Sequence, residues 1–130
     1  MGQGYLLDSH TLMWSVTASG RLGRNSRRLI ARGRGLWFSL LSIAELRLKE
    51  SGGKIQLTEN FEDEIVNSGF LECPLDRQAI STLGRWGELL PRDPFDLLLV
   101  GQAFSRNLTL LTADRRLLAS GLSFIQDAER

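Results

Sequence analysis

Short apolar runs along this chain alternate with longer stretches in which apolar residues recur every three or four positions. The short runs predict five strands, at residues 5–7, 36–40, 70–73, 108–112 and 122–125. The longer stretches predict helices between them. The last but one of the strands, LTLLT, does not alternate apolar with polar residues, which indicates an interior, parallel strand. We therefore expect an α/β sandwich, with a mainly parallel central sheet of four to five strands flanked by helices.

Side chains that can cap helices mark several of the predicted helix starts. Ser42 and Glu45 match a capping box, which puts Glu45 in the first turn of a helix after the second strand. Thr58 is the expected cap of a helix that ends near residue 67. Asp76 is the expected cap of one further helix, which continues through Trp86.

The stretch PRDPFDLLLVGQA, residues 91–103, predicts the start of a buried helix. Asp93 is the expected N-cap, Pro94 takes the first helical position, and Asp96 lies in the first turn near the positive end of the helix dipole. One carboxylate is enough for a cap. Asp96 is therefore either a second part of that cap or one wall of an acidic site.

The composition fits one globular domain over residues 1–130. Apolar residues make up 42% of the chain and charged residues 24%, and no apolar run approaches the ~20 residues needed to span a bilayer. The first ten residues lack the basic and apolar regions of an export signal. Because Cys73 is the only cysteine, no intramolecular disulfide or cysteine zinc site can form. We expect a cytoplasmic protein that is not bound to a membrane.

Arginine is concentrated in one part of the chain, although the net charge is only +1. Six arginines fall within fourteen positions: Arg21, Arg24, Arg27, Arg28, Arg32 and Arg34. This pattern predicts one basic surface. It is either a solvated helix face or a phosphate-binding surface that shares a polyanionic substrate with an acidic metal site.

Four acidic residues stand where predicted strands end or predicted helices begin. Asp8 and Asp114 follow strands, whereas Glu45 and Asp96 lie in first helical turns. Ligands of parallel α/β sheets bind off the carboxyl ends of the strands, so we expect all four carboxylates at one edge. Each acid also has a simpler interpretation as a helix cap or a dipole partner, and Asp8 is the least easily explained as a cap.

A shared site for these carboxylates requires a cation or raised pKa values. Two like charges 4 Å apart repel by roughly 4 kcal/mol at an effective dielectric near 20. Oxygen ligands with no cysteine partner and only one histidine, His10, favour Mg²⁺ or Mn²⁺ over zinc. Such an ion activates water and polarises a phosphodiester, which is hydrolytic nuclease chemistry. His10 is either a ligand or a structural residue, and we expect core packing from the three tryptophans, Trp14, Trp37 and Trp86.

Four segments carry these acids in a fixed order: LLDSHTLMW, SLLSIAELRLKESGGKI, RDPFDLLLVGQA and LLTADRRL. Together they resemble the PIN-domain ribonucleases, specifically the VapC-type toxins of bacterial type II toxin–antitoxin systems. The resemblance covers about residues 6–125. It implies that Asp8, Glu45, Asp96 and Asp114 are the catalytic and metal-binding acids of this chain.

The same resemblance implies roles for other residues and partners. Asp93 becomes a cap and an auxiliary acid, and Thr112 matches the small hydroxyl residue beside the last family acid. The implied activity is endonucleolytic RNA cleavage with Mg²⁺ or Mn²⁺, often of tRNA or ribosomal RNA. A homodimer and a cognate VapB antitoxin, whose tail fills the acidic groove, are implied as well.

Three positions depart from the pattern of these toxins. Leu97 stands where an arginine commonly follows the third acid, Ala44 where an aromatic residue often precedes Glu45, and Arg116 where some relatives place another aspartate. These departures concern substrate contacts and metal occupancy more than the type of reaction.

Two other functions are compatible with parts of the pattern. A phosphatase of the haloacid dehalogenase type also has an aspartate after its first strand, but it needs a second aspartate where this chain has His10. A non-catalytic nucleic-acid-binding or scaffold module would use the arginines and keep the acids as helix caps.

Overall fold

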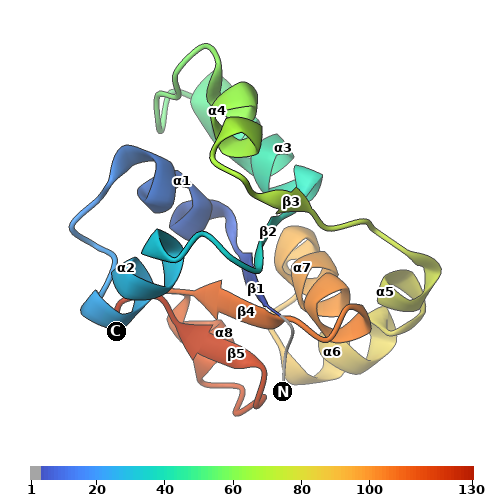
Figure 1. The fold of residues 1–130 in the computed structure, drawn as a ribbon. Helices are drawn as coiled ribbons and strands as arrows, with labels where there is room; N and C mark the ends of the chain where they lie inside the picture. The colour runs from blue at the N-terminus through green and yellow to red at the C-terminus, as the bar shows by residue number, and fades with distance from the viewer. Residues whose placement is uncertain (1–3) are drawn as a thin grey trace.

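The computed structural model describes residues 4–130 and contains one five-stranded sheet (Figure 1). Its strands are β1 (Tyr5–Leu7), β2 (Leu36–Phe38), β3 (Leu71–Glu72), β4 (Thr109–Thr112) and β5 (Ile125–Asp127). They are arranged in the order β3-β2-β1-β4-β5, and every neighbouring pair is parallel. The predicted α/β class and parallel sheet are confirmed.

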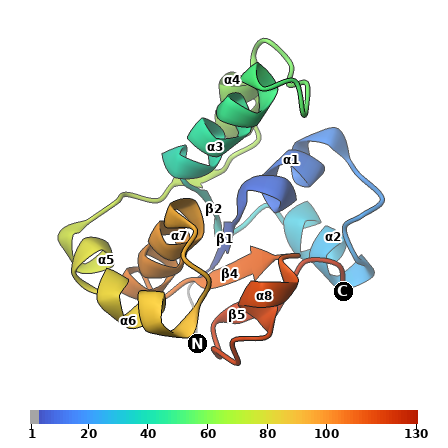
Figure 2. The ribbon, with the colours of Figure 1, turned by 180° about the vertical axis from the view of Figure 1, so that it is seen from behind.

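Helices cover both faces of this sheet. They are α1 (Ser9–Thr17), α2 (Arg24–Ala31), α3 (Leu40–Ser51), α4 (Phe61–Asn67), α5 (Arg77–Ser81), α6 (Leu83–Leu89), α7 (Pro94–Ser105) and α8 (Arg115–Leu118). Side chains of α1 to α4 belong to one apolar cluster, and side chains of α6, α7 and α8 belong to a second. Figures 1 and 2 show α1 to α4 and α5 to α7 on opposite sides of the strands.

Along the central strands, successive side chains alternate between the two apolar clusters. Leu7 and Leu111 pack in the first cluster, whereas Leu6 and Leu110 pack in the second. All four residues of β4 are buried, which explains why its sequence shows no polar alternation. The prediction of an interior, parallel strand is confirmed.

The start of α3 differs from the predicted capping box. Ser39 is the N-cap, and its hydroxyl accepts a hydrogen bond from the Leu41 N–H at 3.1 Å. The Ser42 hydroxyl is buried and has no hydrogen-bond partner among the described residues. Because β2 ends at Phe38, the helix begins three residues earlier than expected. The prediction that Glu45 lies in the first turn is therefore wrong, and it lies in the second.

Other boundaries also differ from the predictions, and β3 and β4 are shorter than the predicted strands at 70–73 and 108–112. Asn60, not Thr58, is the N-cap position of α4. The predicted single helix after Asp76 divides into α5 and α6 at Thr82, although Asp76 does cap α5. The last strand starts at Ile125, not at Leu122; Leu122 and Phe124 pack partly buried against the second cluster, and the Phe124 carbonyl accepts a hydrogen bond from the Leu110 N–H at 2.7 Å.

A close approach between helices fixes the position of α7. A Cβ atom added to Gly101 would lie 2.7 Å from the Ala79 carbonyl oxygen in α5, so only glycine allows this contact. Pro94 at the first position of α7 confirms the predicted helix start. Within residues 4–130, no helix has both the length and the apolar character needed to cross a membrane.

Candidate active site

A cavity of about 400 Å³ lies where β1 and β4 end and α7 begins. The predicted acids all line it: Asp8, Glu45, Asp93, Asp96 and Asp114. The remaining lining residues are Ser9, His10, Trp14, Arg21, Lys49, Ala113 and Arg116. The expectation that the four acids meet at one edge of the sheet agrees with this geometry.

Asp8 follows β1 directly and is 8% exposed. One carboxylate oxygen accepts a hydrogen bond from the Thr11 N–H at 3.0 Å, so Asp8 is the N-cap of α1. Its other oxygen accepts a hydrogen bond from the Thr112 hydroxyl at 2.5 Å. Asp8 thus has a clear capping role, contrary to the expectation. Burial raises the pKa of Asp8, and the hydrogen bonds from Thr112 and Thr11 act in the opposite direction.

Thr112 connects two of the acids. Besides donating to Asp8, its hydroxyl accepts a hydrogen bond from the Asp114 N–H at 3.0 Å. Thr112 is the last residue of β4 and is fully buried. Its side chain therefore fixes the Asp8 carboxylate and the backbone of the loop that carries Asp114.

Asp93 and Asp96 have different environments at the start of α7. The Asp93 carboxylate accepts hydrogen bonds from the N–H groups of Phe95 at 2.9 Å and Asp96 at 3.2 Å, which confirms it as the N-cap. The Asp96 carboxylate accepts no hydrogen bond from residues 4–130, although its side chain is only 15% exposed. Among residues 4–130, Arg116 is the only cation within ion-pair distance of this carboxylate, with its Nη2 atom at 3.9 Å.

The pKa of Asp96 is raised to about 7. Burial is the largest cause, and the negative charges of the other acids of the cavity add to it: Asp93, Asp114, Glu45 and Asp8. A carboxylate that is buried, unbonded and surrounded by like charges is the group in this cavity that gains most from a bound cation.

Glu45 reaches the cavity from the second turn of α3. Its carboxylate accepts a hydrogen bond from the Ser9 hydroxyl and lies 3.7 Å from Lys49 Nζ. Lys49 is also 3.5 Å from the His10 ring. Glu45 makes no capping contact with the start of α3, where Ser39 fills that role.

Asp114 and Arg116 form the opposite side of the cavity. Asp114 is the N-cap of α8, where its carboxylate accepts a hydrogen bond from the Arg116 N–H at 2.9 Å, so the simpler interpretation of Asp114 as a cap agrees with the structure. The Arg116 guanidinium lies 3.4 Å from Asp114 and 3.9 Å from Asp96. An arginine at this position therefore supplies positive charge to two acids.

Several lining residues were not expected from the sequence. Ser9 and Lys49 both contact Glu45. The only sequence signal for Ser9 is that it follows Asp8, and the only signal for Lys49 is that it stands one helical turn after Glu45. Arg21 contacts Trp14, with its guanidinium 4.7 Å from the ring centroid. Trp14 and Trp86 are buried, and Trp37 packs partly buried against the core, which confirms the packing prediction. Trp14 also borders the cavity.

The donor set of the cavity fits a hydrated hard cation. All five acids offer carboxylate oxygens, the ligands that Mg²⁺ and Mn²⁺ prefer. Within residues 4–130 no three Asp, Glu, His or Cys side chains stand close enough to enclose an ion directly. Mg²⁺ usually keeps several waters and takes only one or two carboxylates directly, and the volume of the cavity leaves room for those waters.

Comparison with known proteins identifies the family of this chain. The sequence model of the PIN domain matches residues 5–120. Among curated proteins, no sequence matches this chain.

Solved structures with the same fold come from toxin–antitoxin complexes. The chain is similar to one in VapBC2 from Rickettsia felis bound to a promoter DNA fragment, with 19% identity, coverage of 95% and 97% of the two chains and a TM-score of 0.68. It is also similar to one in DNA-bound VapBC from Salmonella typhimurium, with 21% identity, coverage of 95% and 97% and a TM-score of 0.68. A third match is to VapBC-5 from Mycobacterium tuberculosis, with 18% identity, coverage of 98% and 99% and a TM-score of 0.58. At these identities the structures establish a shared fold, and with the match over residues 5–120 they show that this chain belongs to the PIN domain family.

Proposed function

We propose that this chain is a divalent-metal-dependent endoribonuclease that acts as the toxin of a VapBC-type toxin–antitoxin pair. The observation that carries the proposal is the environment of Asp96. Burial, together with the negative charges of four other acids that line the same cavity, raises the pKa of Asp96 to about 7. Carboxylates with strongly raised pKa values in a cavity are typical of functional sites, and a bound cation would offset the like charges.

Asp8, Glu45, Asp96 and Asp114 would hold Mg²⁺ or Mn²⁺. A bound ion would polarise the phosphodiester and lower the pKa of the attacking water. Thr112 keeps the Asp8 carboxylate oriented.

Asp93 orients α7 and adds negative charge beside Asp96. The cations at the rim, Lys49 and Arg116, offset the charge of a phosphate that approaches the acids.

The partners in this proposal follow from the fold and its relatives. The similar solved chains are parts of VapBC complexes, which supports a VapB-type antitoxin as the partner of this chain. An RNA substrate, such as tRNA or ribosomal RNA, agrees with the hydrolytic chemistry of the acids. We further propose one PIN domain over residues 1–130, a homodimer, and action in the cytoplasm.

The direct test of this function is cleavage of purified tRNA and ribosomal RNA by the isolated protein. We expect internal cleavage with Mg²⁺ or Mn²⁺ and none in excess chelator. Cleavage that continues unchanged in chelator, or intact RNA under all metal conditions, would contradict the proposal. Co-expression with the protein encoded next to this chain should suppress cleavage if that neighbour is the antitoxin.

A non-catalytic RNA-binding module on the same fold is the second candidate. The helix caps favour this candidate, because three acids of the cavity each cap a helix and so have a structural role: Asp8, Asp93 and Asp114. Asp96 and Glu45 have no such role, because neither accepts a hydrogen bond from a helix N-terminus. RNA binding that does not change with metal, with no cleavage after it, would favour the binding module.

A further inference from the structure

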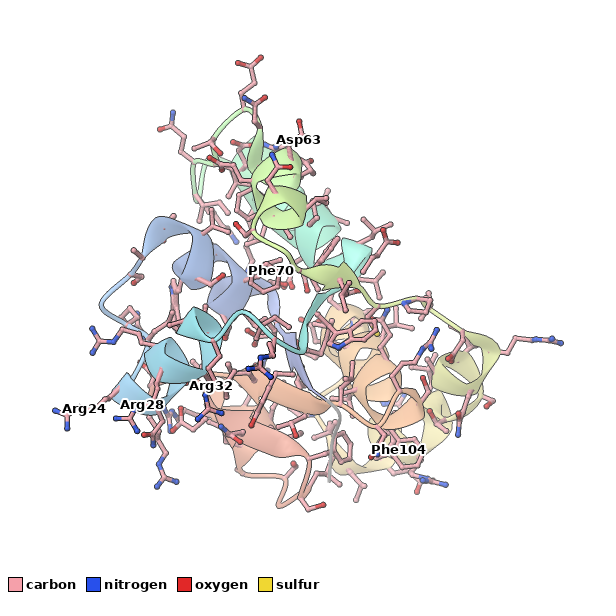
Figure 3. The ribbon with its side chains drawn as sticks, in the orientation of Figure 1. Arg24, Arg28, Arg32, Asp63, Phe70 and Phe104 are labelled. Carbon is pink, nitrogen blue, oxygen red and sulfur yellow. The ribbon has the colours of Figure 1, made fainter. Side chains whose placement is uncertain are left out.

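Helix α2 has one basic face and one apolar face. Ser26 is buried, and Leu29 and Ile30 pack against the first apolar cluster. Four arginines are exposed on the other side: Arg24, Arg27, Arg28 and Arg32. At 100° per residue they fall within an arc of about 140°. Figure 3 shows Arg24 and Arg28 directed outward from α2, away from the body of the protein.

No acid in the described chain neutralises these four arginines. None of them forms an ion pair with a residue in 4–130, and α2 itself contains no acidic residue. Elsewhere in the chain arginines do find acids: Arg47 pairs with Glu50 and Glu62, and Arg115 pairs with Asp127 and Glu129.

The arginines of α2 also repel one another. Arg24, Arg28 and Arg32 stand four residues apart along the helix, where like charges destabilise it. An arrangement of this kind is favoured when negative charge comes from outside the chain.

The start of α2 is held at the edge of the sheet that carries the acidic cavity. The Gly23 N–H donates to the Ala128 carbonyl at 3.0 Å, and the Ser26 N–H donates to the Arg130 oxygen at 3.0 Å. A Cβ atom at Gly23 would lie 2.1 Å from the Arg130 carbonyl carbon, so the contact needs glycine. These bonds fix α2 to the segment that follows the carboxyl end of β5.

Arg21 connects this basic face to the cavity. It precedes α2 by three residues and lines the cavity together with Trp14. Arg21 pairs with Glu129 at 3.1 Å, and the exposed arginines follow it in the sequence along α2. Arg24 and Arg32 are about 12 Å apart along the helix axis at 1.5 Å per residue. A row of guanidinium groups thus follows the residue at the cavity rim.

We propose that the arginine face of α2 binds backbone phosphates of the RNA and holds the strand beside the acidic cavity. This proposal rests on the nuclease function proposed above. RNA fits better than an acidic protein segment, because a row of guanidinium groups that begins at a nuclease cavity matches phosphates that repeat along one strand. The contacts are to phosphates and therefore carry no base specificity.

The test compares two variants that each lose two positive charges. R24Q/R28Q removes two arginines of the face, and glutamine remains a good helix former. K54Q/R77Q is the matched control, because Lys54 and Arg77 are exposed and have no ion pair within residues 4–130. In Figure 1, α5, which carries Arg77, lies at the opposite end of the molecule from α2. A third variant, R24K/R28K, keeps the charge.

Binding is measured by fluorescence anisotropy with labelled single-stranded RNA in excess EDTA, over a series of salt concentrations. We expect R24Q/R28Q to bind about 10-fold more weakly, with a slope of log K against log salt smaller by about 0.7 per arginine removed. The control should bind like wild type, and R24K/R28K should recover most of the affinity. In cleavage assays with metal, R24Q/R28Q should raise KM and leave kcat unchanged.

An equal loss of RNA affinity in R24Q/R28Q and in the control would overturn the proposal, because the loss would then result from the change in net charge. Binding of polyglutamate with the same arginine dependence, and no such dependence for RNA, would point to an acidic protein partner instead. Failure of the nuclease proposal is recognised separately: it appears as absent cleavage in the wild type, whatever the binding in EDTA shows.

Discussion

Arg116 lies between two acids of the cavity, with its Nη2 atom 3.9 Å from Asp96 and 3.4 Å from Asp114. Among residues 4–130 it is the only cation within ion-pair distance of Asp96. Its side chain is 61% exposed, so it can leave the acids without disturbing the core. A metal ion and Arg116 would therefore compete for the same carboxylates.

Arg116→Gln should tighten metal binding. Because the exposed arginine competes with the metal for two carboxylates, its removal should lower the Kd for Mn²⁺ by up to about fivefold. Titration calorimetry measures this. Arg115→Gln is the control, because Arg115 loses the same charge but pairs with Asp127 and Glu129 outside the cavity. The same gain in both variants would show an effect of net charge and not of competition.

Asp96→Asn should stabilise the metal-free protein at high pH. The pKa of Asp96 is about 7 in the folded protein and about 3.9 in an unfolded chain, so folding favours the protonated form. The charged form of Asp96 is therefore penalised in the folded protein, and the free energy of unfolding falls as pH rises from about 4 to 7. Asparagine lacks this penalty. Urea unfolding in chelator should show the variant more stable by on the order of 2–4 kcal/mol at pH 8, and the difference should vanish near pH 4. A difference that does not depend on pH would contradict the assignment.

Thr112→Val should weaken the link between β1 and the loop after β4. The substitution removes the hydroxyl that donates to Asp8 and accepts from the Asp114 N–H. We expect a loss of about 2 kcal/mol in the free energy of unfolding, measured in urea. Thr112→Ser keeps the hydroxyl and should lose less. If serine is no better than valine at this position, the hydrogen bonds do not stabilise the site.

The two serines near the start of α3 should respond differently to alanine. Ser39→Ala removes the hydroxyl that caps the helix and should destabilise the protein by about 1 kcal/mol. Ser42→Ala removes a buried hydroxyl that has no partner among the described residues, so it should be neutral or stabilising. Thermal unfolding of both variants measures this. A larger loss in Ser42→Ala would restore the capping box predicted from the sequence.

The sequence predicted β1, β4 and the start of α7 closely because their signals are local. Leu6 and Leu110 are buried in continuous apolar strands, and Asp93 precedes a proline, which a helix tolerates in its first turn but not in its interior. The start of α3 was misjudged because Ser39 and Ser42 offer the same hydroxyl, and only the end of β2 decides between them.

The acids of the site could be named from the sequence, but their environment could not. The sequence does not predict Asp8 as a cap, because it does not show that α1 starts at the next residue. The contact of Thr112 with Asp8 joins residues 104 positions apart. The pairing of Arg116 with Asp96 likewise depends on the packing of α7 beside β4.

The central claim is that Asp96 takes part in metal-dependent cleavage of RNA, and one comparison tests it most directly. Asp96→Asn is measured against Asp63→Asn, which removes an exposed aspartate on α4 (Figure 3) that forms no ion pair within residues 4–130. We predict that Asp96→Asn lowers the rate of Mg²⁺-dependent RNA cleavage by about 100-fold or more and leaves the protein folded, while Asp63→Asn cleaves like wild type. Cleavage by Asp96→Asn at the wild-type rate would contradict the account.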